Sequence, residues 1–327
     1  MSKKNATIYD VAKLASVSLA TASRVINGSD KVSNDTKAKV LEAIKQLNYR
    51  PNITAVELAS KRNTNVAIIV PELNYTYVSN VVAGLMESAK QYGYDCLIFT
   101  TKDSKSDISK TFSKVLSLRV NGIIIFNDSL DSEELEELIH ADIPVVTLGV
   151  DLKTMSSVSW HYKAQIIDLV NNALSRNKEV YFLHVENAGK MQERMLDGIK
   201  KAYKQNNKDF NNIIEVKDSY KETYNKVNSL ISKLPNCLIM SVRDSIALAA
   251  LNAALDNNLS VPSDYEFMAM IGTKYSELSR PKLSSFNIDM KGLGRKGMET
   301  LAQIIDDYDK FITEKLDFDY IKRGSTL

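Results

Sequence analysis

Three glycines near the C-terminal end have the spacing of a phosphate-binding loop. Gly292, Gly294 and Gly297 form a G-x-G-x-x-G pattern after an apolar run that we expect to be a strand. In a dinucleotide-binding fold, such glycines let a pyrophosphate approach the backbone at the start of a helix. Only 30 residues follow Gly297, too few to complete a nucleotide-binding half. The pattern therefore favours glycines that permit close helix packing, and an enzyme using this motif is a distant alternative.

Other residue types used in catalysis form no recognisable arrangement in the sequence. His140, His161 and His184 are the only histidines, and none has metal-ligand spacing to a cysteine or carboxylate. The sequence contains no G-x-S-x-G elbow, P-loop or paired-thiol motif. Cys96 and Cys237 each lie inside an apolar run, which predicts two buried core thiols. We therefore predict that the protein is not an enzyme and needs no metal or other cofactor.

The segment ASVSLATASRVIN, residues 15–27, indicates a different chemistry. It is rich in small side chains and carries one charge, Arg24, whereas a surface helix usually displays several charges. A helix that enters the major groove of DNA needs a slim exposed face, from which Thr21 and Ser23 can reach phosphates or base edges. Arg24 can donate two hydrogen bonds to a guanine or hold a phosphate. The alternative is an ordinary small-residue helix packed inside a bundle.

Three short helices are expected to position this segment. Thr7 is placed to cap the first, over residues 8–15, and Ser18 to cap the second, which ends at Ile26. Ser33 then caps a third helix over residues 34–47. One face of that helix is predicted to be apolar, with Val40, Leu41, Ile44 and Leu47. Two helices joined by a tight turn and supported by a third form a helix-turn-helix.

The rest of the chain alternates short apolar runs with helical patterns. The runs cover residues 66–70, 96–100, 122–126, 145–149, 180–184, 213–216, 237–242, 267–272 and 284–288. Continuous apolar strands separated by helices indicate parallel sheets covered on both faces. Because nine strands exceed one comfortable sheet, we predict an α/β body of two lobes that meet near residues 159–163.

The charges are unevenly placed along the chain. Of its 327 residues, 44% are hydrophobic and 25% are charged, with a net charge of +2. Residues 1–62 hold 11 basic and 5 acidic side chains, whereas the remainder holds 31 basic and 35 acidic ones. This asymmetry suggests either a polyanionic partner for the N-terminal part or a solvated basic surface. The N-terminus lacks an apolar signal core and no run reaches membrane-spanning length, so we expect a cytoplasmic protein.

The N-terminal motifs resemble the DNA-binding headpiece of the LacI/GalR family of repressors. The matching segments are TIYDVA (7–12), VS (17–18), AT (20–21), SRV (23–25), NG (27–28), VS (32–33), YRPN (49–52) and LAS (58–60). The start TIYDV is shared with one branch of that family, the catabolite control proteins of Gram-positive bacteria. The likeness is dense in the headpiece and looser beyond residue 150.

The resemblance implies roles for individual headpiece residues. Leu19 and Ala20 open the recognition helix where the family reads operator bases, and Arg24 matches a base-contacting arginine. Ala55 and Leu58 match a hinge helix, whose leucine wedges into the minor groove and kinks the duplex. The full set implied to contact DNA is Thr7, Tyr9, Ser18, Leu19, Ala20, Thr21, Ser23, Arg24, Asn27, Tyr49, Asn52, Ala55 and Leu58.

The resemblance also implies three domains. These are a headpiece at 1–51, a hinge helix or linker at 52–63, and a two-lobed effector-binding and dimerisation domain at 64–327 that resembles a periplasmic binding protein. Its cleft would bind an effector through Tyr77, Arg194, Asp244 and Lys274. Lys274 stands where the family usually has an aspartate, and a lysine can only donate hydrogen bonds. With Arg194 it would suit a sugar phosphate better than a neutral sugar, and a ligand-free cleft is the alternative.

Together these features predict a sequence-specific DNA-binding transcriptional regulator without a membrane partner. We expect a homodimeric repressor of carbohydrate or catabolic genes, bound to near-palindromic double-stranded operator DNA. Catabolite control proteins also bind a phosphorylated carrier protein, but Glu299 would repel a phosphoserine and disfavours that partner here. The competing prediction is a sugar-binding or solute-binding protein without a regulatory role, against which the missing signal core argues.

Overall fold

The computed structural model describes residues 6–29, 31–49, 63–101, 105–127, 130, 135, 138–152, 154–186 and 188–327. It divides into two compact units, Met1–Asn63 and Thr64–Leu327. The predicted hinge contacts Asn52, Ala55 and Leu58 lie outside the described residues. No helix within the described ranges is long and apolar enough to cross a membrane.

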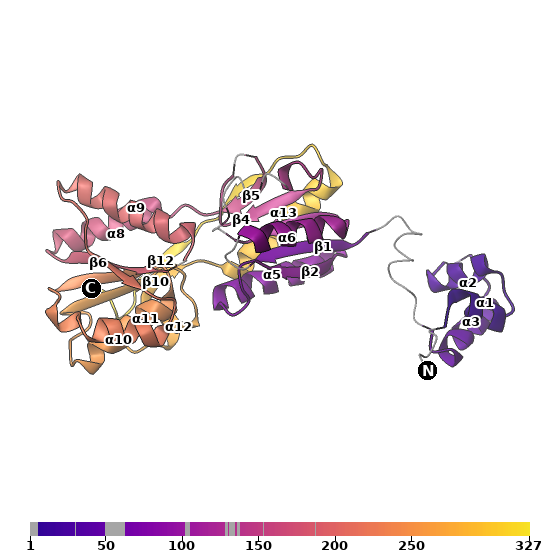
Figure 1. Ribbon diagram of the computed structural model, residues 1–327, viewed down its shortest axis with the longest axis horizontal. Helices are drawn as coiled ribbons and strands as arrows, with labels where there is room; N and C mark the ends of the chain where they lie inside the picture. Colours follow the sequence, from indigo (N-terminus) through magenta and orange to yellow (C-terminus); the bar gives the residue numbers. More distant parts are fainter. Residues whose placement is uncertain are drawn as a thin grey trace. The chain divides into compact units, whose positions relative to one another are not determined.

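The first unit is a bundle of three helices, α1 (Ile8–Leu14), α2 (Leu19–Ile26) and α3 (Asn34–Gln46) (Figure 1). Each begins at its predicted cap, and the capping box at the start of α1 is complete. The buried core consists of Val11, Ala15, Val25, Val40 and Ala43. The predicted helix-turn-helix is therefore confirmed.

One residue of the predicted apolar face of α3 is wrongly assigned. The Leu41 side chain is 57% exposed, whereas Val40 and Ala43 are buried and Ile44 packs partly against them. Successive helical residues are turned by about 100°, so a helix packed through Val40, Ala43 and Ile44 turns Leu41 outward.

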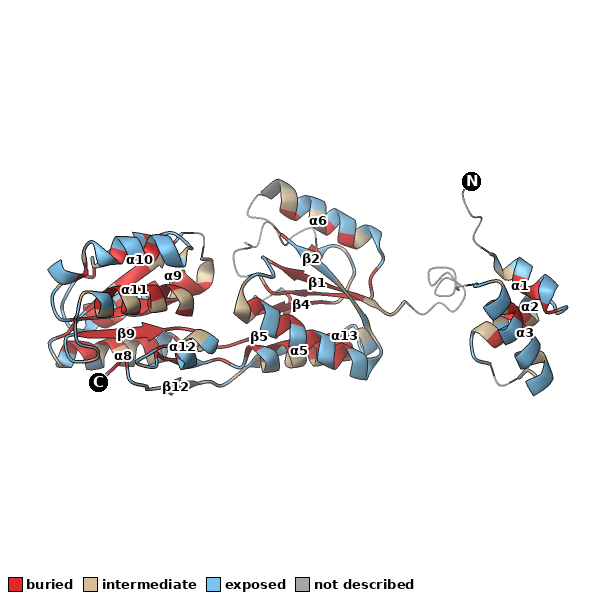
Figure 2. Ribbon diagram, turned by 90° about the horizontal axis from the view of Figure 1, so that it is seen from below, coloured by how far each residue is buried: buried red, intermediate tan, exposed pale blue. Residues whose placement is uncertain are grey.

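The first lobe of the body has a six-stranded sheet in the order β11-β5-β4-β3-β1-β2, with every neighbouring pair parallel. Its strands are β1 (Asn65–Val70), β2 (Asp95–Thr100), β3 (Gly122–Ile125), β4 (Val145–Leu148), β5 (Ser156–Ser159) and β11 (Thr313–Lys315). Figure 2 shows α5 (Thr76–Tyr92) and α13 (Met290–Asp306) on one face of this sheet and α6 (Lys105–Ser117) on the other.

The second lobe has a six-stranded sheet in the order β12-β10-β9-β8-β6-β7, in which only β12 runs antiparallel to its neighbour. Its strands are β6 (Glu179–Val185), β7 (Ile213–Val216), β8 (Cys237–Ser241), β9 (Tyr265–Ala269), β10 (Ser284–Asn287) and β12 (Asp319–Ile321). Helices α8 (Lys163–Ser175) and α9 (Lys190–Gln205) lie on one side of it in Figure 1. On the other side lie α10 (Tyr220–Asn228) and α11 (Asp244–Asp256). The short helix α12 (Lys274–Leu278) follows β9.

All nine predicted apolar runs are strands, and the two-lobed α/β body is confirmed. The sequence analysis missed β5, β11 and β12, which read SSVS, TEK and DYI. These strands are short and mostly polar, so they lack the apolar signal. The chain passes between the lobes after β5, after β10 and between β11 and β12. Of the two predicted core thiols, Cys237 is buried, but Cys96 is only half-buried because β2 is an edge strand.

The glycine pattern at residues 292–297 packs helices together. A Cβ atom added to Gly294 would lie 2.1 Å from the Val81 carbonyl oxygen of α5. One added to Gly84 of α5 would lie 2.0 Å from the Lys291 carbonyl oxygen. Both distances are shorter than real Cβ contacts allow, so the backbones of α5 and α13 touch. The preference for a packing role over a nucleotide-binding loop is confirmed.

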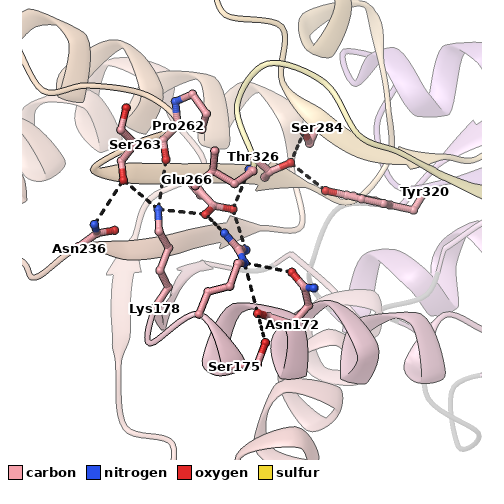
Figure 3. Close-up of polar contacts among 12 residues, drawn as sticks. Asn172, Ser175, Lys178, Asn236, Pro262, Ser263, Glu266, Ser284, Tyr320 and Thr326 are labelled. Carbon is pink, nitrogen blue, oxygen red and sulfur yellow. Dashed lines mark hydrogen bonds and ion pairs between the residues drawn. The ribbon is translucent and has the colours of Figure 1, made fainter.

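A buried carboxylate ties together the second lobe (Figure 3). Glu266 of β9 is 1% exposed and pairs with Arg176, which follows α8, and with Lys178 at 3.0 Å. The Lys178 ammonium also donates to the carbonyl oxygens of Pro262 and Ser263, each at 3.1 Å. Burial by itself would raise the pKa of Glu266, but the hydrogen bonds from Arg176 and Lys178 outweigh it and lower that pKa. All the donors of Lys178 have acceptors, so this cluster fixes the fold.

Candidate nucleic-acid interface and interlobe cleft

Helix α2 begins with an ordered cap. The Ser18 hydroxyl accepts a hydrogen bond from the Thr21 backbone N–H at 3.1 Å, and the two side-chain hydroxyls lie 2.8 Å apart. The first turn holds no acidic residue. The positive end of the helix dipole is therefore not neutralised by its own side chains, which favours an approaching anion such as a DNA phosphate.

The two sides of α2 differ in burial. Ala22 and Val25 are buried against the headpiece core. The Leu19 side chain is 39% exposed, and Ala20 and Arg24, one helical turn apart, are also exposed. The exposed strip of α2 is therefore narrow and carries one guanidinium. It is slim enough to enter a major groove, and the guanidinium can donate hydrogen bonds to base edges there.

The other residues of the headpiece that are predicted to contact DNA differ in their exposure and in their hydrogen bonds. Tyr9 is 68% exposed, but the Thr7 hydroxyl donates to Asp10 at 2.7 Å within the capping box. The Asn27 amide donates to the half-buried Ser23 hydroxyl at 3.4 Å, and Tyr49 packs partly against the headpiece core. Thr7 and Tyr49 thus have clear structural roles in addition to any contact with DNA.

Side chains from both lobes of the body line two small cavities that share Tyr77, Arg243 and Ile271. Their volumes are about 20 Å³ and 90 Å³. The walls of the smaller one include Phe126, Asn127, Trp160, Tyr162 and Met191. The walls of the larger one include Asn74, Tyr75, Asp244, Thr273 and Tyr275. Together they form a cleft between the lobes with several aromatic side chains in its walls.

The four predicted effector contacts lie in different surroundings. Tyr77 lines both cavities, and Asp244 lines the larger one. Arg194 lines neither cavity and donates from Nη1 to the Gly149 carbonyl oxygen of the other lobe at 3.0 Å. Lys274 is exposed and lines neither cavity, and its ammonium nitrogen lies 5.6 Å from the centroid of the Tyr275 ring. The cavities thus bring Tyr77 and Asp244 together, but not Arg194 and Lys274.

Asp244 already has a full set of hydrogen bonds. Its carboxylate is 2% exposed and accepts from the backbone N–H groups of Ile271, Gly272 and Thr273. It also accepts from the Ser276 hydroxyl at 3.2 Å. These contacts fasten the loop after β9 to the start of α11, so Asp244 shapes the cleft wall.

Sequence reasoning missed Arg243, which is central to the cleft. It is 8% exposed, lines both cavities, and its Nη1 lies 3.0 Å from an Asp218 carboxylate oxygen. Its position just after β8 was an available signal, because ligand sites of open α/β sheets lie beyond the carboxyl ends of strands. Within the described ranges, no group of three or more His, Cys, Asp or Glu side chains could hold a metal ion.

The comparisons with known proteins agree with this architecture. Residues 7–52 match the family model "Bacterial regulatory proteins, lacI family". Residues 63–318 match "Periplasmic binding proteins and sugar binding domain of LacI family". The chain belongs to the LacI family. This LacI-family protein is a DNA-binding transcriptional regulator, the function predicted from its headpiece, and its relatives are transcriptional regulators.

Its similarity to known proteins extends over nearly the whole chain. Catabolite control protein A of Staphylococcus xylosus is 34% identical over 93% of this chain and 93% of its own. That of Staphylococcus epidermidis is 34% identical over 92% and 93%. The lac repressor dimer bound to operator and the anti-inducer ONPF superposes with a TM-score of 0.87 and 25% identity, covering 99% of this chain and 100% of that one.

Proposed function

We propose that this LacI-family regulator acts without catalysis, as a homodimeric repressor of carbohydrate or catabolic genes on a near-palindromic operator. The observation that carries the proposal is the exposed strip of α2, where Leu19, Ala20 and Arg24 face away from the headpiece core. A single headpiece presents one such helix, and two-fold operators mirror two-fold proteins. The 34% identity to catabolite control protein A supports catabolic genes as targets.

Each part of the chain has its own task in this function. Residues 1–51 read the operator, 52–63 form the hinge, and 64–327 bind the effector and dimerise. In the headpiece, Leu19 and Ala20 contact bases, Arg24 donates to a guanine, and exposed Tyr9 and Asn27 approach the phosphate backbone. Ser18 and Thr21 order the start of α2 through their hydrogen bonds.

The effector is proposed to be a sugar or sugar phosphate bound in the interlobe cleft. Tyr77 lies on its wall, and Asp244 holds the loop that closes it. A phosphorylated carrier protein is the less favoured partner. Glu299 on α13 pairs with Lys296 at 3.2 Å and its side chain is 39% exposed, so it presents a negative charge that would repel a phosphoserine.

Selection of binding sites from random DNA duplexes tests the proposal. The full chain should enrich a two-fold sequence, which then serves in gel-shift titrations of the native chain, Arg24→Ala and Arg24→Lys. A bidentate arginine–guanine contact contributes about 1–3 kcal/mol of discrimination, so Arg24→Ala should lower operator preference about tenfold or more. Arg24→Lys keeps the charge but not the two-pronged geometry, and should retain non-specific binding while losing preference at one base pair.

A matched variant separates base reading from general charge. Lys45→Ala removes one exposed positive charge from the last turn of α3 and should leave operator preference unchanged. For the native chain, log affinity should fall linearly with log salt, by about 0.9 for each phosphate neutralised. No enriched sequence, or equal operator preference for native chain and Arg24→Ala, would contradict the assignment of α2.

A further inference from the structure

Three side chains join the two lobes at the centre of the cleft. Tyr75, just before α5 of the first lobe, donates from its hydroxyl to Asp218 of the second lobe at 2.7 Å. The Arg243 guanidinium carbon, also of the second lobe, lies 4.1 Å from the centroid of the Tyr75 ring. We propose that Tyr75, Asp218 and Arg243 form a bridge that occupies the cleft in place of a ligand and holds the lobes together when no effector is bound.

Arg243 is the buried member of this bridge, Tyr75 is half-buried and Asp218 is exposed. Arg243 is 8% exposed, and both its attraction to the Tyr75 ring and its pairing with Asp218 gain strength where water is excluded. The Tyr75 ring stacks on Tyr77 with centroids 5.5 Å apart, and Tyr77 meets Phe126 edge-on at 6.1 Å. The first lobe therefore supplies a fixed aromatic surface, against which the guanidinium of the second lobe rests.

The space left around the bridge is too small for an effector. A cavity of about 20 Å³ holds about one water molecule, and one of about 90 Å³ holds only a few. A ligand must displace Tyr75, and because Arg243 and Asp218 stay paired within the second lobe, it must replace the hydrogen bond that the Tyr75 hydroxyl donates to Asp218. This inference rests on the proposed function in taking the cleft as the effector site, and it makes Tyr75 the group with which an effector competes.

Other contacts also cross between the lobes. Arg194 donates to the Gly149 carbonyl oxygen at 3.0 Å, and the Lys190 ammonium donates to the Leu130 carbonyl oxygen at 2.5 Å. Neither of these contacts uses Arg243 or Tyr75. Loss of the bridge should therefore increase opening of the cleft while the lobes stay connected.

The single tryptophan of the chain reports on this opening. Trp160 is 3% exposed and lines the same cavity as Arg243, so acrylamide quenching of its fluorescence measures access to the cleft. The full chain is compared with Tyr75→Phe and Arg243→Met. Tyr75→Phe loses a hydrogen bond to a charged group, which shifts an opening equilibrium about tenfold, and Arg243→Met loses the guanidinium that rests on the Tyr75 ring. The quenching constant should therefore rise several-fold in Tyr75→Phe and should also rise in Arg243→Met.

Tyr224→Phe is the matched control. It removes the same kind of bond, from the Tyr224 hydroxyl to Asp256 at 2.6 Å, but within the second lobe. Its quenching constant should equal that of the native chain, and an equal rise in this control would contradict a specific role for Tyr75. Tyr75→Phe removes a single oxygen and decides the test if Arg243→Met does not fold by circular dichroism.

The outcomes separate the bridge from the proposed function. Unchanged quenching in folded Tyr75→Phe, with operator binding intact, overturns the bridge alone. Failure of the native chain to select an operator overturns the proposed function whatever the quenching shows.

Discussion

Gly294 of α13 lies directly against Val81 of α5, so that the two helices touch through their backbones. Helix α13 follows the last central strand of the second lobe, yet it packs beside the first helix of the first lobe (Figure 2). The first lobe is therefore completed by a segment from near the C-terminal end of the chain, and the absence of a side chain at residue 294 permits that completion.

Gly294→Ala should destabilise the body. A methyl group there would lie 2.1 Å from a carbonyl oxygen, and helices forced apart in a packed core lose about 1–3 kcal/mol or more. Gly292→Ala is the comparison, because the nearest atoms that its Cβ would meet belong to the Asp289 side chain, which can turn away at the loss of its cap on α13, a smaller cost of about 1 kcal/mol. Urea unfolding measures both changes in free energy. Equal stability of Gly294→Ala and the native chain would show that the helices can separate freely at this point.

Ser18→Ala should weaken DNA binding beyond its effect on stability. Ser18 and Ser33 make the same cap, each accepting from a threonine N–H three residues on. Losing either should lower headpiece stability by about 1 kcal/mol. Only Ser18 begins α2, so Ser18→Ala should reduce operator affinity more than Ser33→Ala in parallel gel shifts. If both variants lose the same affinity, the cap acts through folding alone.

His184 should make stability depend on pH near neutrality. Its ring nitrogens lie 2.7 Å from Glu215 and 3.1 Å from Glu193. Burial by itself would lower the pKa of His184, but the hydrogen bonds to the two carboxylates raise it. Because the pKa is higher in the folded state, this stabilisation is complete below about pH 6.5 and is lost as the pH rises through the folded-state value.

Thermal unfolding of the native chain and His184→Gln between about pH 6 and 8 checks this prediction. The melting temperature of the native chain should fall relative to that of the variant as the pH rises. An NMR titration of His184 in the native chain and in Glu215→Gln should show a lower pKa in the variant. Parallel melting profiles for native chain and His184→Gln would contradict the prediction.

Glu266→Gln should be among the most damaging substitutions in the second lobe. It leaves Lys178, 7% exposed at its side chain, beside Arg176 without a carboxylate, and breaking such a buried pair costs about 3–5 kcal/mol. Glu222→Gln is the control: its partner Lys217 lies at 3.5 Å on the surface, where a pair contributes under about 1 kcal/mol. Urea unfolding compares them, and equal losses would show that the Glu266 cluster is not a key element of the lobe.

Acid should weaken the same cluster. The pKa of Glu266 is lowered in the folded state, so its stabilisation is present above the unfolded value, about 4.3, and is lost as the pH falls through the folded one. The acid-induced loss of stability should accordingly be shallower in Glu266→Gln than in the native chain.

The sequence alone determined the features that depend on neighbouring residues. The caps at Thr7, Ser18 and Ser33 are local hydrogen bonds, so the three headpiece helices and their starts could be predicted. The apolar runs predicted nine strands, since a strand buried on both faces must be apolar throughout. The short polar strands β5, β11 and β12 exist only because neighbouring strands pair with them, and local patterns do not show that pairing.

The tertiary structure decided how the cleft is built. Tyr75 is far from Asp218 and Arg243 in the chain and meets them only when the two lobes close on each other. Sequence reasoning chose Asp244 and Lys274, but the fold satisfies the Asp244 carboxylate with backbone donors and leaves Lys274 in solvent. Residue type sets which interactions a side chain can make. The packing of distant segments decides which of them it makes, because burial and partners come from elsewhere in the chain.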